Sequence, residues 1–101
     1  MVDLNKNLKL VAELCKGWES DTYKSAFEEL VEELKKQKIE LEYEIFEIED
    51  NSLEIYVEKN GNRTKVFSRK LTGKWLNFQN IQIVVKKIRE LIWYLKAKIL
   101  W

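Results

Sequence analysis

The stretch that decides the fold is residues 39–69, IELEYEIFEIEDNSLEIYVEKNGNRTKVFSR. Apolar and polar residues alternate along it with a period of two, which is typical of strands with one buried face. Asp50 and Asn51 interrupt the pattern once and predict a turn. Asn60 and Gly61 predict a type I′ hairpin, because both central positions of that turn need positive φ. The stretch therefore predicts a three-stranded antiparallel meander.

The alternation shifts by one residue inside the first of these strands. Leu41 and Tyr43 are apolar at odd positions, whereas Phe46 and Ile48 are apolar at even ones. A β-bulge absorbs one extra residue, so we expect a bulge at Ile45 and Phe46. The apolar face of the meander then consists of Leu41, Tyr43, Phe46, Ile48, Leu53, Ile55, Val57 and Val66.

The opposite face of the meander is polar, and we expect water to cover it. The turn at Asn60 and Gly61 sets Glu58 opposite Arg63 and Ile55 opposite Val66. The outer residues are Glu42, Glu44, Glu47, Glu49, Glu54, Tyr56, Glu58, Arg63, Lys65, Phe67 and Arg69. The turn at Asp50 and Asn51 sets Ile48 opposite Leu53, so that Glu42 faces Glu58 and Glu47 faces Glu54 across the first two strands. An alternative role for this face is a binding surface around Tyr56 and Phe67.

Two helices are expected before the meander. Asp3 is a candidate cap for the first, and Gly17 would end it. Its apolar stripe would be Leu4, Leu8, Val11, Cys15 and Trp18. The second begins at Ser20 or Asp21, has helical spacing throughout, and ends in lysines that suit the helix dipole. Its outward residues include Glu28, Glu29, Glu32 and Glu33, which disfavours a helix-turn-helix reading because a recognition helix needs basic residues.

The last 25 residues predict one long helix that is apolar on two opposite faces. Asn77 is a good N-cap, and we place the start near Phe78. A core-facing stripe consists of Ile81, Val84, Val85, Ile88, Leu91, Ile92, Leu95 and Ile99. A second stripe gathers Ile83, Trp93, Tyr94, Ala97 and Trp101 around Glu90. Either the first helix covers this second stripe, or a partner does.

The net charge of +1 hides an uneven distribution. Residues 63–101 contain ten bases and one acid, hence +9, whereas residues 1–62 contain eight bases and sixteen acids, hence −8. The two parts either neutralise each other on folding or leave a basic surface for an anionic partner. The candidate phosphate-binding residues are Arg63, Lys65, Arg69, Lys86, Lys87, Lys96 and Lys98.

The residue inventory argues against catalysis. The chain has no histidine, one cysteine and three glycines, so it lacks a histidine base, a Cys/His zinc site and a glycine-rich phosphate loop. Cys15 lies on the apolar stripe of its expected helix and is read as a buried structural thiol. Paired glutamates on the strands are read as solubilising residues. We therefore expect no enzyme, no metal and no cofactor.

These patterns predict a single α+β domain over residues 1–101. Two N-terminal helices precede the three-stranded meander with its bulged first strand, and a long C-terminal helix packs on the sheet. The function expected is protein association, as a homodimer or on a larger partner, through Ile83, Trp93, Tyr94, Ala97 and Trp101. The alternative is nucleic-acid binding by the basic residues of the third strand and last helix.

The compartment expected is the cytoplasm. The first ten residues lack the basic start and apolar run of a signal peptide, and one cysteine permits no internal disulfide. Charged residues interrupt the last helix, so we expect no membrane span. An amphipathic helix resting on a membrane surface is less favoured, because the Ile, Val and Leu stripe suits the domain's own sheet.

Overall fold

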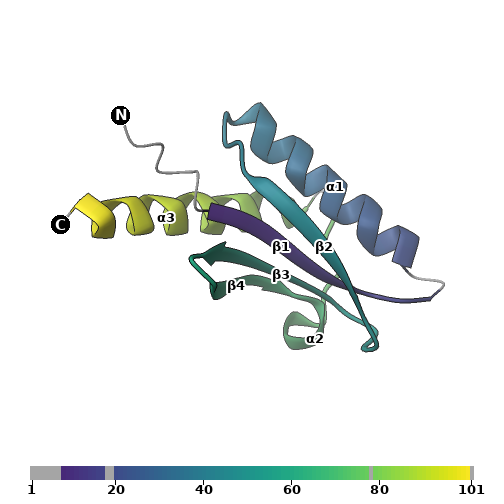
Figure 1. Cartoon of the computed structure of the whole chain (residues 1–101). Coiled ribbons are helices and arrows are strands. Elements are labelled where there is room, and N and C mark those ends of the chain that lie inside the picture. Colours follow the sequence, from purple (N-terminus) through teal and green to yellow (C-terminus); the bar gives the residue numbers. More distant parts are fainter. Residues whose placement is uncertain (1–7, 18–19, 78, 101) are drawn as a thin grey trace.

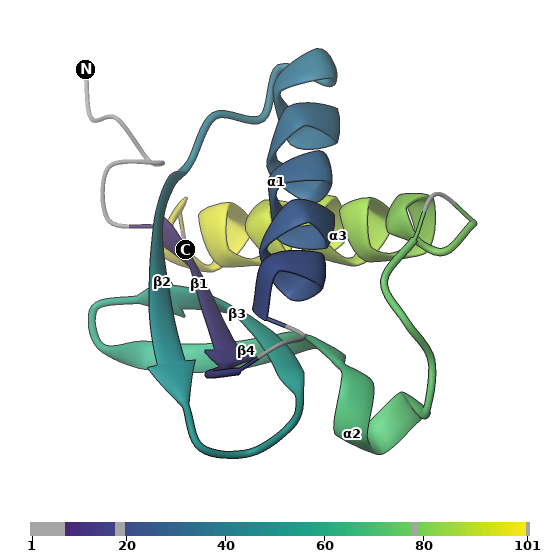
Figure 2. The same cartoon turned by 90° about the vertical axis from the view of Figure 1, so that its right-hand side faces the viewer.

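The computed structural model of the chain describes residues 8–17, 20–77 and 79–100, and for residues 96–100 the backbone alone. The elements are β1 (Leu8–Cys15), α1 (Ser20–Lys36), β2 (Glu42–Ile48), β3 (Leu53–Lys59), β4 (Asn62–Ser68), α2 (Arg69–Thr72) and α3 (Ile81–Leu100). Four strands form one mixed sheet in the order β2-β1-β3-β4. Both long helices pack on the same face of this sheet (Figures 1 and 2). The fold is therefore an α+β arrangement of two layers.

The expected first helix is wrong, because its described part is the strand β1. The apolar residues of LKLVAELC fit a helical stripe and a strand alternation about equally well. Leu10 and Ala12 point into the core, whereas Val11 lies on the other face and is also fully buried. A strand buried on both faces has a nearly continuous apolar run, and such a run does not reveal its period. The remaining residues of the expected helix, Asp3, Leu4 and Trp18, lie outside the described residues.

The expected three-stranded meander is also wrong, because β1 lies between β2 and β3. β1 pairs with β2 in parallel, with Leu10 beside Tyr43, and with β3 antiparallel, with Leu10 beside Val57. α1 connects β1 to β2, as parallel neighbours require a crossover. Ile48 and Leu53 therefore do not face each other. The turn at Asp50 and Asn51 leads β3 to the far side of β1 (Figure 1).

The β-bulge lies in a different strand from the one expected. β2 keeps a continuous register with β1, so Ile45 faces the core and Phe46 the outer face. The irregularity lies where Ile55 pairs with Phe67 while Tyr56 pairs with Lys65, leaving Val66 as the extra residue. Phe67 consequently turns inward and is buried, contrary to its expected place on the outer face.

The Asn60-Gly61 hairpin is confirmed. Asn60 has φ 52° and Gly61 has φ 85°, as a type I′ turn requires. The turn sets Glu58 beside Arg63, as expected. Asparagine and glycine tolerate the left-handed region, so the local sequence alone fixes this turn.

The second expected helix and the core-facing stripe of the last helix are confirmed. α1 buries one side, and α3 buries Ile81, Val84, Val85, Ile88 and Ile92 in the same cluster. Leu91 and Leu95 pack against this cluster, and Ile99 lies outside the described side chains. One apolar core thus joins the sheet to both helices. The buried residues of α1 are Tyr23, Phe27, Leu30, Val31 and Leu34.

The start of α3 is fixed by two asparagines. Asn77 Oδ1 accepts hydrogen bonds from the amides of Gln79 and Asn80 at 2.9 and 3.3 Å, and the Asn77 carbonyl accepts one from Ile81 at 2.8 Å. Asn80 Oδ1 accepts in return from the Asn77 amide at 2.8 Å. Asn77 therefore serves as the expected N-cap, although the continuous helix begins at Ile81, three residues after Phe78.

The central position of β1 makes a spectroscopic prediction. Residues Leu10–Leu14 should show the negative Cα secondary shifts of a strand, together with slow exchange at every amide, because alternate amides bond to β2 and β3. β2 has no described neighbour on its other side, so its amides should alternate between slow and fast exchange. NMR hydrogen exchange on labelled protein measures both. Helical Cα shifts over Leu10–Leu14 would contradict the topology.

Candidate functional site

The outward face of α3 exposes three large apolar side chains. Ile83, Trp93 and Tyr94 are 57%, 74% and 59% exposed. The segment expected to cover them as a helix is, over residues 8–15, a strand of the sheet. Ala97 and Trp101, expected on the same stripe, lie outside the described side chains. We call the exposed residues Ile83, Trp93 and Tyr94 the α3 stripe.

Charged side chains border the α3 stripe. Lys86, Lys87 and Arg89 are exposed, and Glu90 is the one acid in α3. The predicted Lys96 and Lys98 fall outside the described side chains. Helical spacing of about 100° per residue places Lys86, Lys87 and Glu90 between Ile83 at one end and the two aromatic residues at the other.

The candidate phosphate-binding residues of β4 lie elsewhere and contact acids. Arg63 Nε donates to Glu58 Oε1 at 3.0 Å, and Arg63 Nη1 donates to Glu13 Oε2 at 3.4 Å. Hydrogen bonding to Glu58 raises the pKa of the Arg63 guanidinium. Lys65 Nζ lies 4.0 Å from Glu54 Oε1 and 5.5 Å from the centre of the Tyr56 ring. These cations are therefore neutralised within the sheet.

Arg69, which was also expected to bind phosphate, packs over an aromatic ring. Its guanidinium lies 4.8 Å from the centre of the Trp75 ring, which stacks on Tyr23 with ring centroids 5.0 Å apart. Because Arg63 and Lys65 occupy the outer face of the sheet and α3 covers the inner face, the structure does not bring the predicted phosphate-binding residues together.

The glutamate pairs on the outer face differ from those expected. Glu54 lies beside Glu13 of β1, and Glu58 lies beside Lys9. Lys9 Nζ bridges Glu44 at 2.6 Å and Glu58 at 3.9 Å, and the bond to Glu44 raises the pKa of Lys9. Inserting β1 between the two acidic strands thus places a lysine among the glutamates. Sequence reasoning missed this because it assigned Lys9 to a helix.

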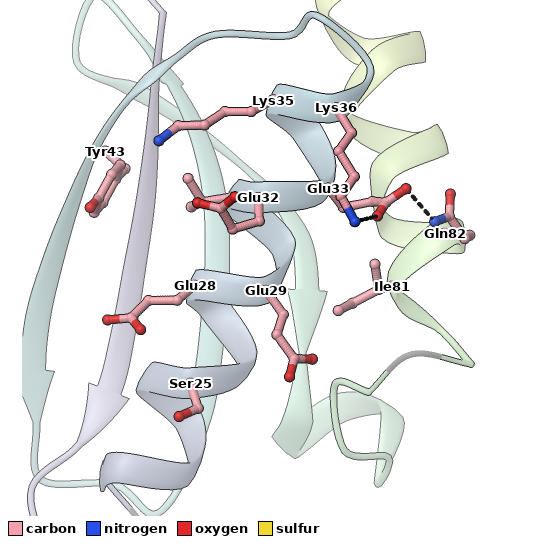
Figure 3. Close-up of a pocket in the computed structure, with 11 residues that line it drawn as sticks. Ser25, Glu28, Glu29, Glu32, Glu33, Lys35, Lys36, Tyr43, Ile81 and Gln82 are labelled. Atoms are coloured by element: carbon pink, nitrogen blue, oxygen red, sulfur yellow. Dashed lines mark hydrogen bonds and ion pairs between the residues drawn. The ribbon is translucent and has the colours of Figure 1, made fainter.

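A hollow of about 730 Å³ borders the outward face of α1 (Figure 3). It is lined by Glu28, Glu29, Glu32 and Glu33 and reaches Gln82 on α3. Gln82 Nε2 donates to Glu33 Oε1 at 2.7 Å, which lowers the pKa of Glu33. Among the described residues, no cluster of three or more His, Cys, Asp or Glu side chains can hold a metal ion. The outward face of α1 is therefore a charged surface, to which Lys35 and Lys36 also contribute, and it meets the start of α3 at Gln82.

No described helix is long and apolar enough to cross a membrane. Charged residues interrupt α3 at Lys86, Lys87, Arg89 and Glu90. This agrees with the expectation from the sequence that the last helix does not span a bilayer.

Arg63 should be the main contributor among the ion pairs of the outer face. Arg63→Ala removes two carboxylate contacts and the contacts with the rings of Phe46 and Tyr56, at 5.6 and 5.7 Å from their centres. We expect a loss of about 1 kcal/mol in the free energy of unfolding, since the side chain is partly exposed. Urea denaturation measures it. The control Lys16→Ala breaks only the exposed pair with Glu49 and should change nothing measurable; equal effects would contradict the role of Arg63.

Comparisons with known proteins identify no family for this chain. No family model matches it, and neither does any curated protein or any solved structure. Among the described residues, the exposed α3 stripe beside its mixed charges is the feature that points most directly to a function.

Proposed function

We propose that this chain is a non-enzymatic association module that pairs with a second copy of itself through the outward face of α3. The observation that carries the proposal is the exposure of Ile83, Trp93 and Tyr94 on one helix face. Aromatic side chains bury large rigid areas at low entropy cost and dominate the energetics of interfaces. Exposed apolar residues grouped on one face within a charged border are typical of such a surface.

The apolar residues of the α3 stripe are placed for antiparallel pairing. Ile83 and Tyr94 lie eleven positions apart, which corresponds to about 16 Å along the helix. A two-fold axis between positions 88 and 89, perpendicular to α3, would set Ile83 opposite Trp93 and Tyr94 of the second copy. The same contact then forms twice, as an isologous interface requires.

The charges between these ends complement each other in the same arrangement. The axis that pairs the apolar ends also sets Glu90 opposite Lys86 and Lys87 of the second copy. Opposite charges at facing positions select register and orientation in paired helices. In a parallel arrangement Glu90 would face Glu90, and the lysines would face lysines. Charge complementarity therefore favours the antiparallel pairing.

Nucleic-acid binding, the alternative function, receives less support. Arg63 and Lys65 contact Glu58, Glu13 and Glu54, so a phosphate would have to displace these carboxylates. The bases of α3 alone form a small basic area that Glu90 interrupts. A larger protein partner on the α3 stripe is the other alternative, and it would leave the isolated chain monomeric.

We further propose the cytoplasm as the compartment. The chain contains a single cysteine, Cys15, which is buried in β1 and so forms no internal disulfide. A domain whose core rests on apolar packing without disulfides suits a reducing environment.

Replacing Trp93, the most exposed residue of the α3 stripe, should abolish self-association. We expect the wild-type chain to sediment as a dimer at high micromolar concentration, and Trp93→Ala to sediment as a monomer, because the largest exposed apolar side chain of the interface is lost. Leu71→Ala removes an equally exposed apolar side chain from α2 and should leave the dimer intact. A wild-type monomer at this concentration would overturn self-pairing.

Charge reversal tests the antiparallel register. Glu90→Lys and Lys87→Glu should each weaken the dimer about tenfold, which corresponds to about 1.4 kcal/mol, because each places like charges face to face twice. An equimolar mixture of the two variants should recover a heterodimer, since both facing pairs are then opposite in charge. Analytical ultracentrifugation of each variant and of the mixture measures this.

The matched control is Glu29→Lys, which makes the same change of net charge on the exposed face of α1. It should leave the dimer unchanged. If the mixture associates no better than the single variants, the antiparallel register is wrong.

A further inference from the structure

The strand β2 forms one edge of the sheet, and its outer side has no described neighbour (Figure 2). The Ile48 carbonyl accepts a hydrogen bond from the Lys16 amide at 3.0 Å, on the side of β1. Backbone groups of successive residues alternate between the two sides of a strand, so those of Tyr43, Ile45 and Glu47 point to the open side. These three residues offer a row of backbone donors and acceptors to an added strand.

Two devices that commonly protect an edge strand, proline and a bulge, are absent from β2. The chain contains no proline, and β2 keeps a continuous register with β1. The opposite edge, β4, differs, because the extra residue Val66 makes a bulge there. Tyr43 packs against Phe27 on the inner face and Phe46 lies beneath Arg63 on the outer face. Tyr43 and Phe46 remain 48% and 42% exposed, so an added strand would bury apolar surface on both faces.

The charge of β2 and its flanks determines which strand fits. Residues 38–50 contain six acids and one base, Lys38. Ion pairs with lysines of other segments, at 2.6, 3.2 and 3.7 Å, neutralise three of these acids. Three acids and one base remain, which leaves a formal charge of −2. The three remaining acids are exposed and form no ion pair with a described residue: they are Glu40, Glu42 and Glu47.

These glutamates disfavour a second copy of the chain on this edge. Pairing of β2 with β2 would bring two acidic strands side by side, and like charges on neighbouring strands repel. A basic strand would instead be attracted. The neighbouring helix α1 adds both signs, because Glu28, Glu32 and Lys35 point toward the side on which Tyr43 lies (Figure 3). The sign of the edge is therefore set by β2 itself.

We propose that the open edge of β2 binds an extended peptide of a partner protein, in which lysine or arginine alternates with apolar residues. The peptide adds as a fifth strand and pairs with the backbone of Tyr43, Ile45 and Glu47. Its basic side chains lie on the outer face beside Glu42, with their aliphatic stems on Phe46. Its apolar side chains continue the inner face of the sheet beside Tyr43 and Ile45.

Hydrogen exchange measured by NMR tests the added strand. The probe is acetyl-Lys-Val-Lys-Val-Lys-Val-Lys-amide. In the free protein the amides of Tyr43, Ile45 and Glu47 should exchange fast, and saturating peptide should slow each at least tenfold, because they then donate to the peptide. The amides of Glu44 and Phe46 already face β1 and should not change.

Two results of this measurement would overturn the proposal. The first is unchanged exchange at Tyr43, Ile45 and Glu47 in the presence of the peptide, or no saturable binding at all. The second is slow exchange at these amides in the free protein, because the edge would then be occupied already.

Two control peptides separate strand addition from charge attraction alone. Acetyl-Glu-Val-Glu-Val-Glu-Val-Glu-amide has the opposite charge and should not bind. Acetyl-Lys-Val-Lys-Pro-Lys-Val-Lys-amide keeps the charge, but its proline replaces a valine whose amide faces β2, so it should bind at least tenfold more weakly. Equal affinity of the proline peptide and the probe would overturn strand addition.

Charge reversal on β2 tests the electrostatic part. Glu42→Lys should weaken binding of the probe about tenfold, because it places like charges on neighbouring strands. The matched control is Glu29→Lys, which makes the same change of net charge on α1, where Glu29 points away from Tyr43 (Figure 3). Equal affinities of the two variants would overturn the charge assignment. These measurements do not involve the α3 stripe, so their outcome is independent of self-association.

Discussion

The fold depends on β1, which lies between β2 and β3 in the sheet and carries buried side chains on both of its faces. β1 hydrogen-bonds to β2 in parallel and to β3 in antiparallel, so it joins the crossover unit β1-α1-β2 to the hairpin of β3 and β4. Its inner side chains, such as Leu10 and Leu14, enter the core beneath both helices, and Val11 is buried on the outer face. Without β1, β2 would lose its partner, and the glutamates of β2 and β3 would lose Lys9 between them.

The two faces of the molecule balance charge differently. On the outer face of the sheet, Lys9 and Arg63 each bridge two glutamates, which neutralises strands that are strongly acidic or basic when read alone. Part of the charge asymmetry along the sequence is therefore cancelled by packing, through the ion pairs of Arg63, Lys65 and Lys70. The α3 stripe differs from this face, because its apolar side chains meet solvent beside exposed charges.

Local signals predicted the elements that depend on local chemistry. The helical spacing of α1, the Asn60-Gly61 turn and the core-facing stripe of α3 were all predicted correctly, because each is set by neighbouring residues. The prediction failed at Leu8–Cys15, where a strand buried on both faces has no clear period. It failed again at Phe67, which was expected on the outer face. The bulge lies at Val66 and not at Phe46, so Phe67 pairs with Ile55 and points into the core. Both errors concern pairing between segments distant in the sequence.

The sequence by itself determined which residues form α1, α3 and the hairpin, and which side of α3 faces the core, because spacing and turn chemistry act within a few residues. Only the tertiary structure decided that β1 separates β2 from β3, that Arg63 is held by Glu13 and Glu58, and that Ile83, Trp93 and Tyr94 remain exposed. The physical reason is that strand order and side-chain burial depend on contacts between distant segments. A strand with alternating apolar and polar residues can pair with several other strands of the same chain. The strand order is fixed only when the apolar side chains on both faces of β1 are buried.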